Sequence, residues 1–327
     1  MAISYTDFSF SKSINKSVPI WVMVRKEISD HIRSWQFIIL SLIIAFTFFE
    51  SLYVAINNLS SAVSNTKDPD HLLVYLKLLT TTDGTLPPFH VFISFLGPLL
   101  GISLGFNAIN SEQQNGTLIR VMAQPVYRDN LLLSKFISVT ILISTMFLSL
   151  TLFMIGGGLL ITGVPIEIEE VIRILSYIII CVFYVEFWFS LSIIFSIKFK
   201  QAATAAIASI GLWLFFTIFY NIIINIVSKV ITPKSSLFSP GRYSWIETLF
   251  HMSPNQLYTD ATTTLLMPKV RSLGPMSMEE LAGAIPNSLP IRDSLLIVWP
   301  QVSGLISATI VCFALAYYFF MRKEIKC

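Results

Sequence analysis

Six long apolar stretches lie along the chain, separated by polar connections. Each is long enough for an α-helix that crosses the hydrocarbon core of a bilayer, which takes about 20 predominantly apolar residues. None alternates apolar with polar residues, as the strands of a membrane β-barrel would. The pattern predicts six transmembrane helices over Trp35–Ile56, Phe89–Ile109, Ile137–Ile161, Val171–Ile197, Ala202–Val227 and Leu295–Phe320.

The composition supports an all-α polytopic membrane protein. Of the 327 residues 54% are hydrophobic and 13% are charged, about half the charged fraction of a soluble domain. The mean hydropathy is +0.72. A net charge of +3 is too small to indicate nucleic acid as a partner. We therefore expect a multi-pass protein of the cell membrane, with the lipid bilayer as its main environment.

The basic residues predict that both termini face the cytoplasm. In that orientation the cytoplasmic segments hold 13 Lys and Arg, whereas the two short outer loops hold three and are rich in acids. Cytoplasmic loops of membrane proteins carry such an excess. The chain then divides into a cytoplasmic N-terminus, five spans, an extracytoplasmic segment, and a last span with a cytoplasmic tail, over residues 1–34, 35–227, 228–294 and 295–327.

Two segments next to the spans carry helical patterns of their own. Apolar residues, including Trp21, recur at helical spacing over Val18–Trp35, and basic residues fill the other face. This predicts a helix lying in the membrane interface; a helix packed on a soluble partner is the alternative. The segment 228–294 is long enough for a small cap with short helices, such as Met278–Ala284, and could recognise cargo or an extracytoplasmic partner.

Three glycines in the second span share one helix face. Gly97, Gly101 and Gly105 follow one another at intervals of four residues. Small residues in register let another helix approach closely. We therefore expect this face to pack against a second span rather than against lipid.

The 27 residues over 110–136 are far more than a simple loop between two spans requires. Gly116 breaks the chain, Thr117 can cap a short helix over Leu118–Ala123, and Pro125 ends it. We predict a short helix across the cytoplasmic mouth of the second and third spans.

The same segment resembles a known family, the ABC-2 type permeases. These are membrane subunits of type V ABC transporters, and the resemblance is to the branch without a fused ATPase. The family pattern runs roughly E-x-x-x-G-T-L, then P-[VI]-x-R, then G-K, and Ser134 departs from it by replacing the last glycine. The matching residues are Glu112, Gly116, Thr117, Leu118, Pro125, Val126, Arg128, Leu132 and Lys135.

The resemblance implies that this segment holds a coupling helix that docks into a separate ATP-hydrolysing subunit, which binds ATP and Mg. It also implies two permease subunits, either two copies or one copy and a paralogue. Arg120 and Arg128 can serve as contacts or as positive-inside anchors, or as both. The residues expected at the coupling site are Glu112, Gly116, Thr117, Leu118, Arg120, Pro125 and Arg128.

Motifs for chemistry within the chain itself are missing from the sequence. The run Gly156-Gly157-Gly158 lies inside a span and has no Lys-Ser/Thr after it, so it is not a phosphate-binding loop. There is no HExxH motif, and the four His are scattered. We expect neither an enzyme nor a metal or cofactor site in this chain.

A few polar side chains fall within the spans. Glu50 and Glu186 are acids at membrane depth, where they either line a translocation path or fix helix packing through a hydrogen bond. Asn221 and Asn225, one turn apart, either hydrogen-bond across a helix interface, including one between subunits, or line that path.

We favour the permease subunit of an ATP-driven exporter. A channel or secondary transporter without ATP is the alternative, which the scarcity of ionisable residues and of broken span pairs disfavours. An integral-membrane enzyme ranks third. No motif selects among lipid, peptide, drug, ion and polysaccharide as cargo.

Overall fold

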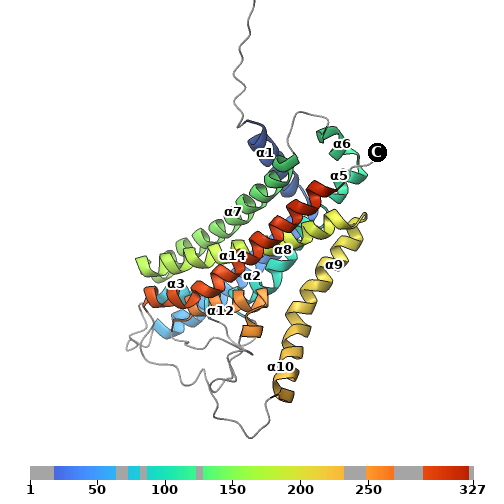
Figure 1. The fold of residues 1–327 in the computed structure, drawn as a ribbon. Helices are drawn as coiled ribbons and strands as arrows, with labels where there is room; N and C mark the ends of the chain where they lie inside the picture. Colours follow the sequence, from blue (N-terminus) through green and yellow to red (C-terminus); the bar gives the residue numbers. More distant parts are fainter. Residues whose placement is uncertain are drawn as a thin grey trace, which may run out of the picture.

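The computed structural model, shown in Figure 1, describes residues 18–63, 73–81, 87–122, 128–231, 248–268 and 290–323. All regular elements in these ranges are helices. Six helical segments are long and apolar enough to cross a membrane, which confirms the predicted number of spans. They are α2 (Trp35–Val63), α4 (Phe89–Gly105), α7 (Arg128–Thr162), α8 (Ile168–Lys198), α9 (Ala202–Leu214) with its continuation, and α14 (Ile291–Arg322).

Helix α8 is the centre of the bundle. It packs against α4, α7, α9 and α14, and Trp188 and Phe189 are fully buried. A capping box starts the helix: Glu167 accepts from the backbone of Glu170, whose side chain accepts from the Glu167 amide. The apolar window of α8 is 78% buried inside the bundle, more than that of any other candidate span in the described residues.

The glycine face of α4 lies against α8. A Cβ added to Gly101 would stand 2.5 Å from the carbonyl oxygen of Val185, and one added to Gly105 would stand 2.8 Å from that of Phe189. Gly97 has looser contact, 3.4 Å from the side chain of Tyr184. Gly101 and Gly105 thus allow a backbone approach that no larger residue permits.

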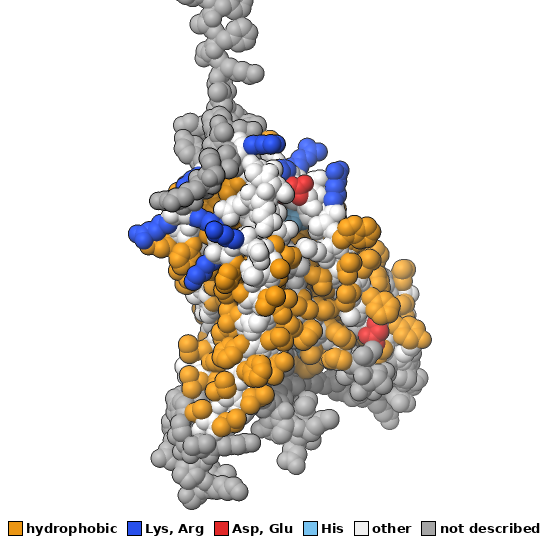
Figure 2. All heavy atoms as spheres, turned by 90° about the vertical axis from the view of Figure 1, so that its right-hand side faces the viewer, with side chains coloured by type: hydrophobic (Ala, Val, Ile, Leu, Met, Phe, Trp, Pro, Cys, Tyr) orange, Lys and Arg blue, Asp and Glu red, His pale blue; other side chains and the backbone are white. Residues whose placement is uncertain are grey.

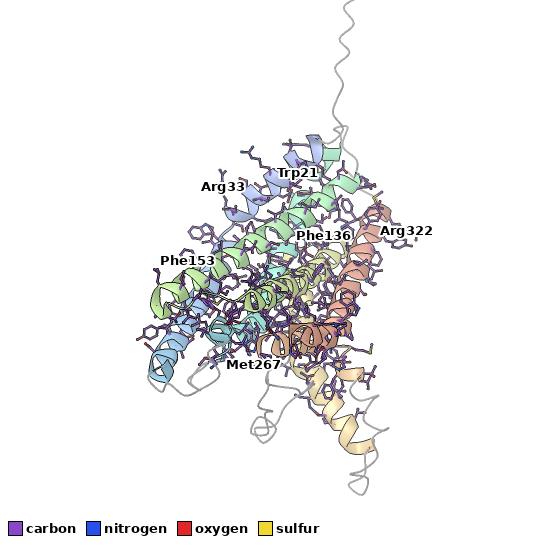
Figure 3. All side chains as sticks on the ribbon, turned by 90° about the vertical axis from the view of Figure 1, so that its left-hand side faces the viewer. Trp21, Arg33, Phe136, Phe153, Met267 and Arg322 are labelled. Carbon is purple, nitrogen blue, oxygen red and sulfur yellow. The ribbon has the colours of Figure 1, made fainter. Side chains whose placement is uncertain are left out.

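The other spans surround this pair. Phe136 of α7 inserts its ring between those of Phe189 on α8 and Phe313 on α14, with centroids 5.1 and 4.3 Å away (Figure 3). Helix α9 continues through a π-helical turn, η2 (Phe215–Phe219), into α10 (Tyr220–Ile231). This continuous rod leans away from the bundle in Figure 1 and exposes many apolar side chains.

Two short helices cover one end of the bundle, which we call the capped end: α3 (Val74–Thr80) and α12 (Pro254–Leu266). The fully buried Arg173 of α8 ties this end together, because its Nη1 donates to the Leu265 carbonyl and to Ser294 Oγ, both at 3.1 Å. Helix α3 was not predicted. Short helices were expected in the segment that holds α12, but α12 itself was not placed, although Pro254 at a first helical turn was a usable signal. The helix expected over Met278–Ala284 lies outside the described residues.

The opposite end carries α1 (Val18–Ile32), α5 (Asn110–Gln114) and α6 (Thr117–Met122), and we call it the basic end. Lys and Arg side chains gather there in Figure 2, above a broad apolar belt. Helix α1 ends before the predicted Trp35, because Ser34 Oγ donates to the His31 carbonyl at 2.8 Å and accepts from the Phe37 amide at 3.4 Å. Ser34 thereby separates α1 from α2.

We predict that Gly101→Ala destabilises the protein by about 1–3 kcal/mol, because the new methyl group clashes with the backbone of α8. Gly156→Ala is the matched control, since no atom lies within 4 Å of its added Cβ. The measurement is the free energy of unfolding in mixed detergent micelles. Equal effects of the two substitutions would contradict the close α4–α8 contact.

Candidate functional site

The candidate site is the short helix α5 and the side chains that hold it at the basic end. A turn over Phe106–Ile109 separates α5 from the end of α4. After α5, Asn115 and Gly116 form a second turn, in which Gly116 has a φ of +66°, a value that favours glycine. These two turns make α5 a separate rod between α4 and α6.

Lys135 of α7 joins α5 to α1. Its side chain is only 3% exposed, and its Nζ lies 2.9 Å from Glu27 Oε2 on α1 and 2.8 Å from Glu112 Oε1 on α5. Lys26 adds a second cation, 3.2 Å from Glu27 Oε1. We call these four residues the Lys135 cluster. A buried ammonium needs such partners, so the cluster fixes three helices relative to one another.

The two residues after Glu112 bind other elements. Lys323, just after α14, donates from Nζ to Gln113 Oε1 at 3.0 Å and also to the Ile197 carbonyl at the end of α8. Gln114 Nε2 donates to the Lys200 carbonyl at 3.1 Å, in the connection between α8 and α9. Three consecutive side chains of α5 therefore contact three different parts of the bundle.

The start of α5 is fixed to α8. Ser196 Oγ accepts from the amides of Ile109 and Asn110, at 3.1 and 3.2 Å. The fully buried Asn110 side chain, with its nitrogen turned toward two carbonyls, donates to Phe199 at 2.7 Å and to Ser196. These bonds satisfy backbone groups at the helix start that would otherwise stay unpaired.

Helix α6 presents one buried and one exposed side. Leu118 is 1% exposed and packs into the core, so it positions the helix. Arg120 is exposed. Thr117 Oγ1 donates back to the Glu112 carbonyl at 3.2 Å, across the Gly116 turn. Arg128 begins α7, and Pro125 lies outside the described residues.

Comparison with known proteins identifies the family of this chain. The sequence pattern of ABC-2 family transporter proteins matches residues 21–325. The chain belongs to the ABC-2 transporter family. It is also similar to two proteins named "Probable ABC transporter permease protein NosY". The one from Pseudomonas aeruginosa is 24% identical over 94% of this chain and 99% of its own length; the one from Stutzerimonas stutzeri is 23% identical over 93% and 98%.

Membership of the ABC-2 family identifies the chain as a membrane subunit of an ABC transporter. The coupling residues expected from the sequence lie in the segment between the second and third spans. Of the coupling residues expected from the sequence, the structure brings Glu112 together with Lys135, and places Gly116 and Thr117 at the turn between α5 and α6. Glu112 is largely covered by its partner, with a side chain only 14% exposed. Its position suits a residue that holds α5 in place.

The polar residues of the spans do not gather at one place. Glu186 is buried and accepts a hydrogen bond from Thr140 Oγ1 of α7, which joins α7 to α8 in the manner of a packing contact. Glu50 is half-buried on α2. On α10, Asn221 is half-buried whereas Asn225 is exposed.

Sequence reasoning missed Glu27, Ser196 and Lys323 as members of the site. A signal existed for Glu27, which lies among the apolar positions of α1 although it is charged. Nothing in the local sequence marks Ser196 or Lys323, because their partners are more than 80 residues away. Within the described ranges, no group of three or more His, Cys, Asp and Glu is placed to hold a metal ion.

The charge state of Glu27 follows from its surroundings. Burial alone would raise the pKa of this carboxyl, but the attraction of Lys135, their hydrogen bond and Lys26 together hold the pKa below its ordinary value. Glu27 is therefore ionised at neutral pH. Burial is also the main cause that lowers the pKa of the nearby His31, which favours its neutral form.

We predict that Lys135→Met destabilises the protein by about 3–5 kcal/mol, because two carboxylates are left covered without their shared cation. Lys198→Met, at an exposed position of the same end, should cost about 1 kcal/mol or less. Combining Lys135→Met with Glu27→Gln and Glu112→Gln should recover much of the loss, since it leaves no unpaired charge. Unfolding in mixed micelles measures all three. A triple variant as unstable as the single one would contradict the electrostatic role.

A pH dependence follows from the lowered pKa of Glu27. The stabilisation from this carboxylate is present above its unfolded value of 4.5 and is lost as the pH falls through its lower folded value. The free energy of unfolding of the wild type should therefore decrease below about pH 4.5, and that of Glu27→Gln should decrease less. Parallel pH profiles would exclude Glu27 as a titrating contributor.

Proposed function

We propose that this chain is the permease subunit of an ATP-driven exporter, in which α5 passes the movement of a separate ATPase subunit to the spans. The observation that carries the proposal is a set of three contacts made by α5. Glu112 binds Lys135 of α7, which also binds Glu27 of α1. Gln113 binds Lys323 just after α14, and Gln114 binds the α8–α9 connection. A rod fixed to so many helices cannot move without moving them. Export direction follows from the resemblance to type V permeases.

The basic end faces the cytoplasm in this proposal. Exposed cations gather there (Figure 2), whereas the capped end carries the acids Glu167, Glu169 and Asp293. This distribution agrees with the preference of Lys and Arg for cytoplasmic segments. Both termini are then cytoplasmic, and the capped end is available to an extracytoplasmic partner.

The ATPase subunit binds at α6 and supplies ATP and Mg. Helix α6 has the form this requires, because Leu118 anchors it in the core while Arg120 stays exposed. A second permease, either another copy or a paralogue, completes the transporter beside the α9–α10 rod. The covered Oδ1 of Asn221 has no hydrogen-bond partner among the described residues, which suits an amide at a helix–helix interface.

We predict that the wild-type protein, extracted from native membranes in mild detergent, co-purifies with a near-stoichiometric subunit that contains a Walker A motif. Arg120→Glu should reduce the recovered ATPase several-fold, because it reverses the charge at the contact surface. Arg292→Glu, an equal charge reversal at an exposed position of the capped end, is the control and should not. Mass spectrometry of the purified complex gives the ratio of the subunits.

Two outcomes would contradict the proposal. One is a permease dimer that survives extraction without any ATPase. The other is an ATPase lost equally with Arg120→Glu and Arg292→Glu, which would place the contact away from α6.

A further inference from the structure

We propose that α1 carries a binding surface for the headgroups of anionic phospholipids, built on Arg25 and Arg33. Both side chains are exposed; Arg25 lies on α1, and Arg33 lies eight residues later, in the turn directly after α1, where its amide still donates to the Ser29 carbonyl in the helical pattern. At about 1.5 Å per residue, two turns of helix separate them by about 12 Å. This spacing places two guanidinium groups along the edge of the bundle rather than at one point.

The packing of α1 determines which of its sides is available. Val24 and Glu27 are buried against the bundle, where α1 lies on α7. Trp21, Arg25 and Arg33 lie on the other side. Figure 3 shows Trp21 on this helix and Arg33 directly after its end, at the outer edge of the basic end. Since the span α2 begins at Trp35, directly after α1, this side lies at the level of the membrane surface.

The charges on this side are not balanced within the protein. Lys26 forms ion pairs with both carboxylates of α1: its Nζ lies 3.2 Å from Glu27 Oε1 and 3.6 Å from Asp30 Oδ2. Among the described residues no carboxylate lies within ion-pair distance of Arg25 or Arg33. Two unpaired guanidinium groups at a bilayer surface attract anionic headgroups, and guanidinium matches phosphate geometry.

The apolar neighbours point to lipid rather than to a soluble protein. Trp21 is 62% exposed and Trp35 is 77% exposed, and Ile32 lies exposed between them in sequence. Tryptophan is enriched at the level of the lipid headgroups. A surface that pairs exposed Trp and Ile with unpaired Arg is typical of a helix that binds an anionic leaflet.

The surface is connected to the candidate site through one residue of the same helix. Glu27 reaches Lys135, and Lys135 reaches Glu112 on α5, so a lipid that holds α1 in place also steadies α5. This consequence depends on the proposed function. The binding of lipid by α1 does not depend on it.

The test measures lipid selectivity of the full-length protein alone, in phosphatidylcholine vesicles that contain spin-labelled phosphatidylglycerol or spin-labelled phosphatidylcholine. Wild type should hold more labelled phosphatidylglycerol than phosphatidylcholine in its motionally restricted fraction. The double variant Arg25→Gln/Arg33→Gln should lower this preference by about three-fold or more at low salt. Arg292→Gln, which removes a positive charge at the capped end, should leave it unchanged.

An unchanged preference in the double variant would overturn the proposal, as would an equal loss in Arg292→Gln, which would show an effect of net charge only. The double variant can also be tested in the co-purification described above. If it recovers less ATPase subunit while its lipid preference is unchanged, a protein rather than lipid covers this side of α1, and the proposal is overturned. Because the vesicles contain no ATPase, a negative result here leaves the proposed function untouched.

Discussion

The structure of the basic end depends on one constraint: the buried ammonium of Lys135 must be paired with carboxylates. Lys135 has almost no access to water, and a single partner would leave much of its hydrogen-bonding capacity unused. It binds Glu27 from one side and Glu112 from the other. The sequence positions of these carboxylates, before the first span and after the second, bring α1 and α5 to the same point on α7. Separating these helices would expose Lys135 or leave both carboxylates without their cation.

Helix α8 and its close contacts connect the basic end to the capped end. The close approach of α4 to α8 at Gly101 and the burial of α8 on nearly all sides give the centre a rigid rod. Arg173 fixes the far end of that rod to α12 and α14. In the proposed mechanism, packed helices rather than a loop would transmit a displacement at α5. This arrangement suits an ABC transporter subunit whose energy source lies outside its own chain.

The spans, the helix before the first span and the short helix after Gly116 were predictable from the sequence, because each follows from local periodicity or from a glycine. It also placed Glu112 and Lys135 in one motif. The partners that give the motif its geometry were not predictable, since Glu27 lies 108 residues from Lys135 and Lys323 lies 210 residues from Gln113. Helices α3 and α12 could not be placed along the sequence, because they are short and take their stability from packing rather than from a span-length apolar run.

The most direct test of the central claim is a double-mutant cycle on Glu27→Gln and Glu112→Gln, measured as free energies of unfolding in mixed micelles. Each single substitution leaves Lys135 with one carboxylate, whereas the double substitution leaves a buried ammonium without any. The account predicts that the double variant loses at least about 1 kcal/mol more than the sum of the two single losses. Losses that add within about 0.5 kcal/mol would show that α1 and α5 are not joined through Lys135.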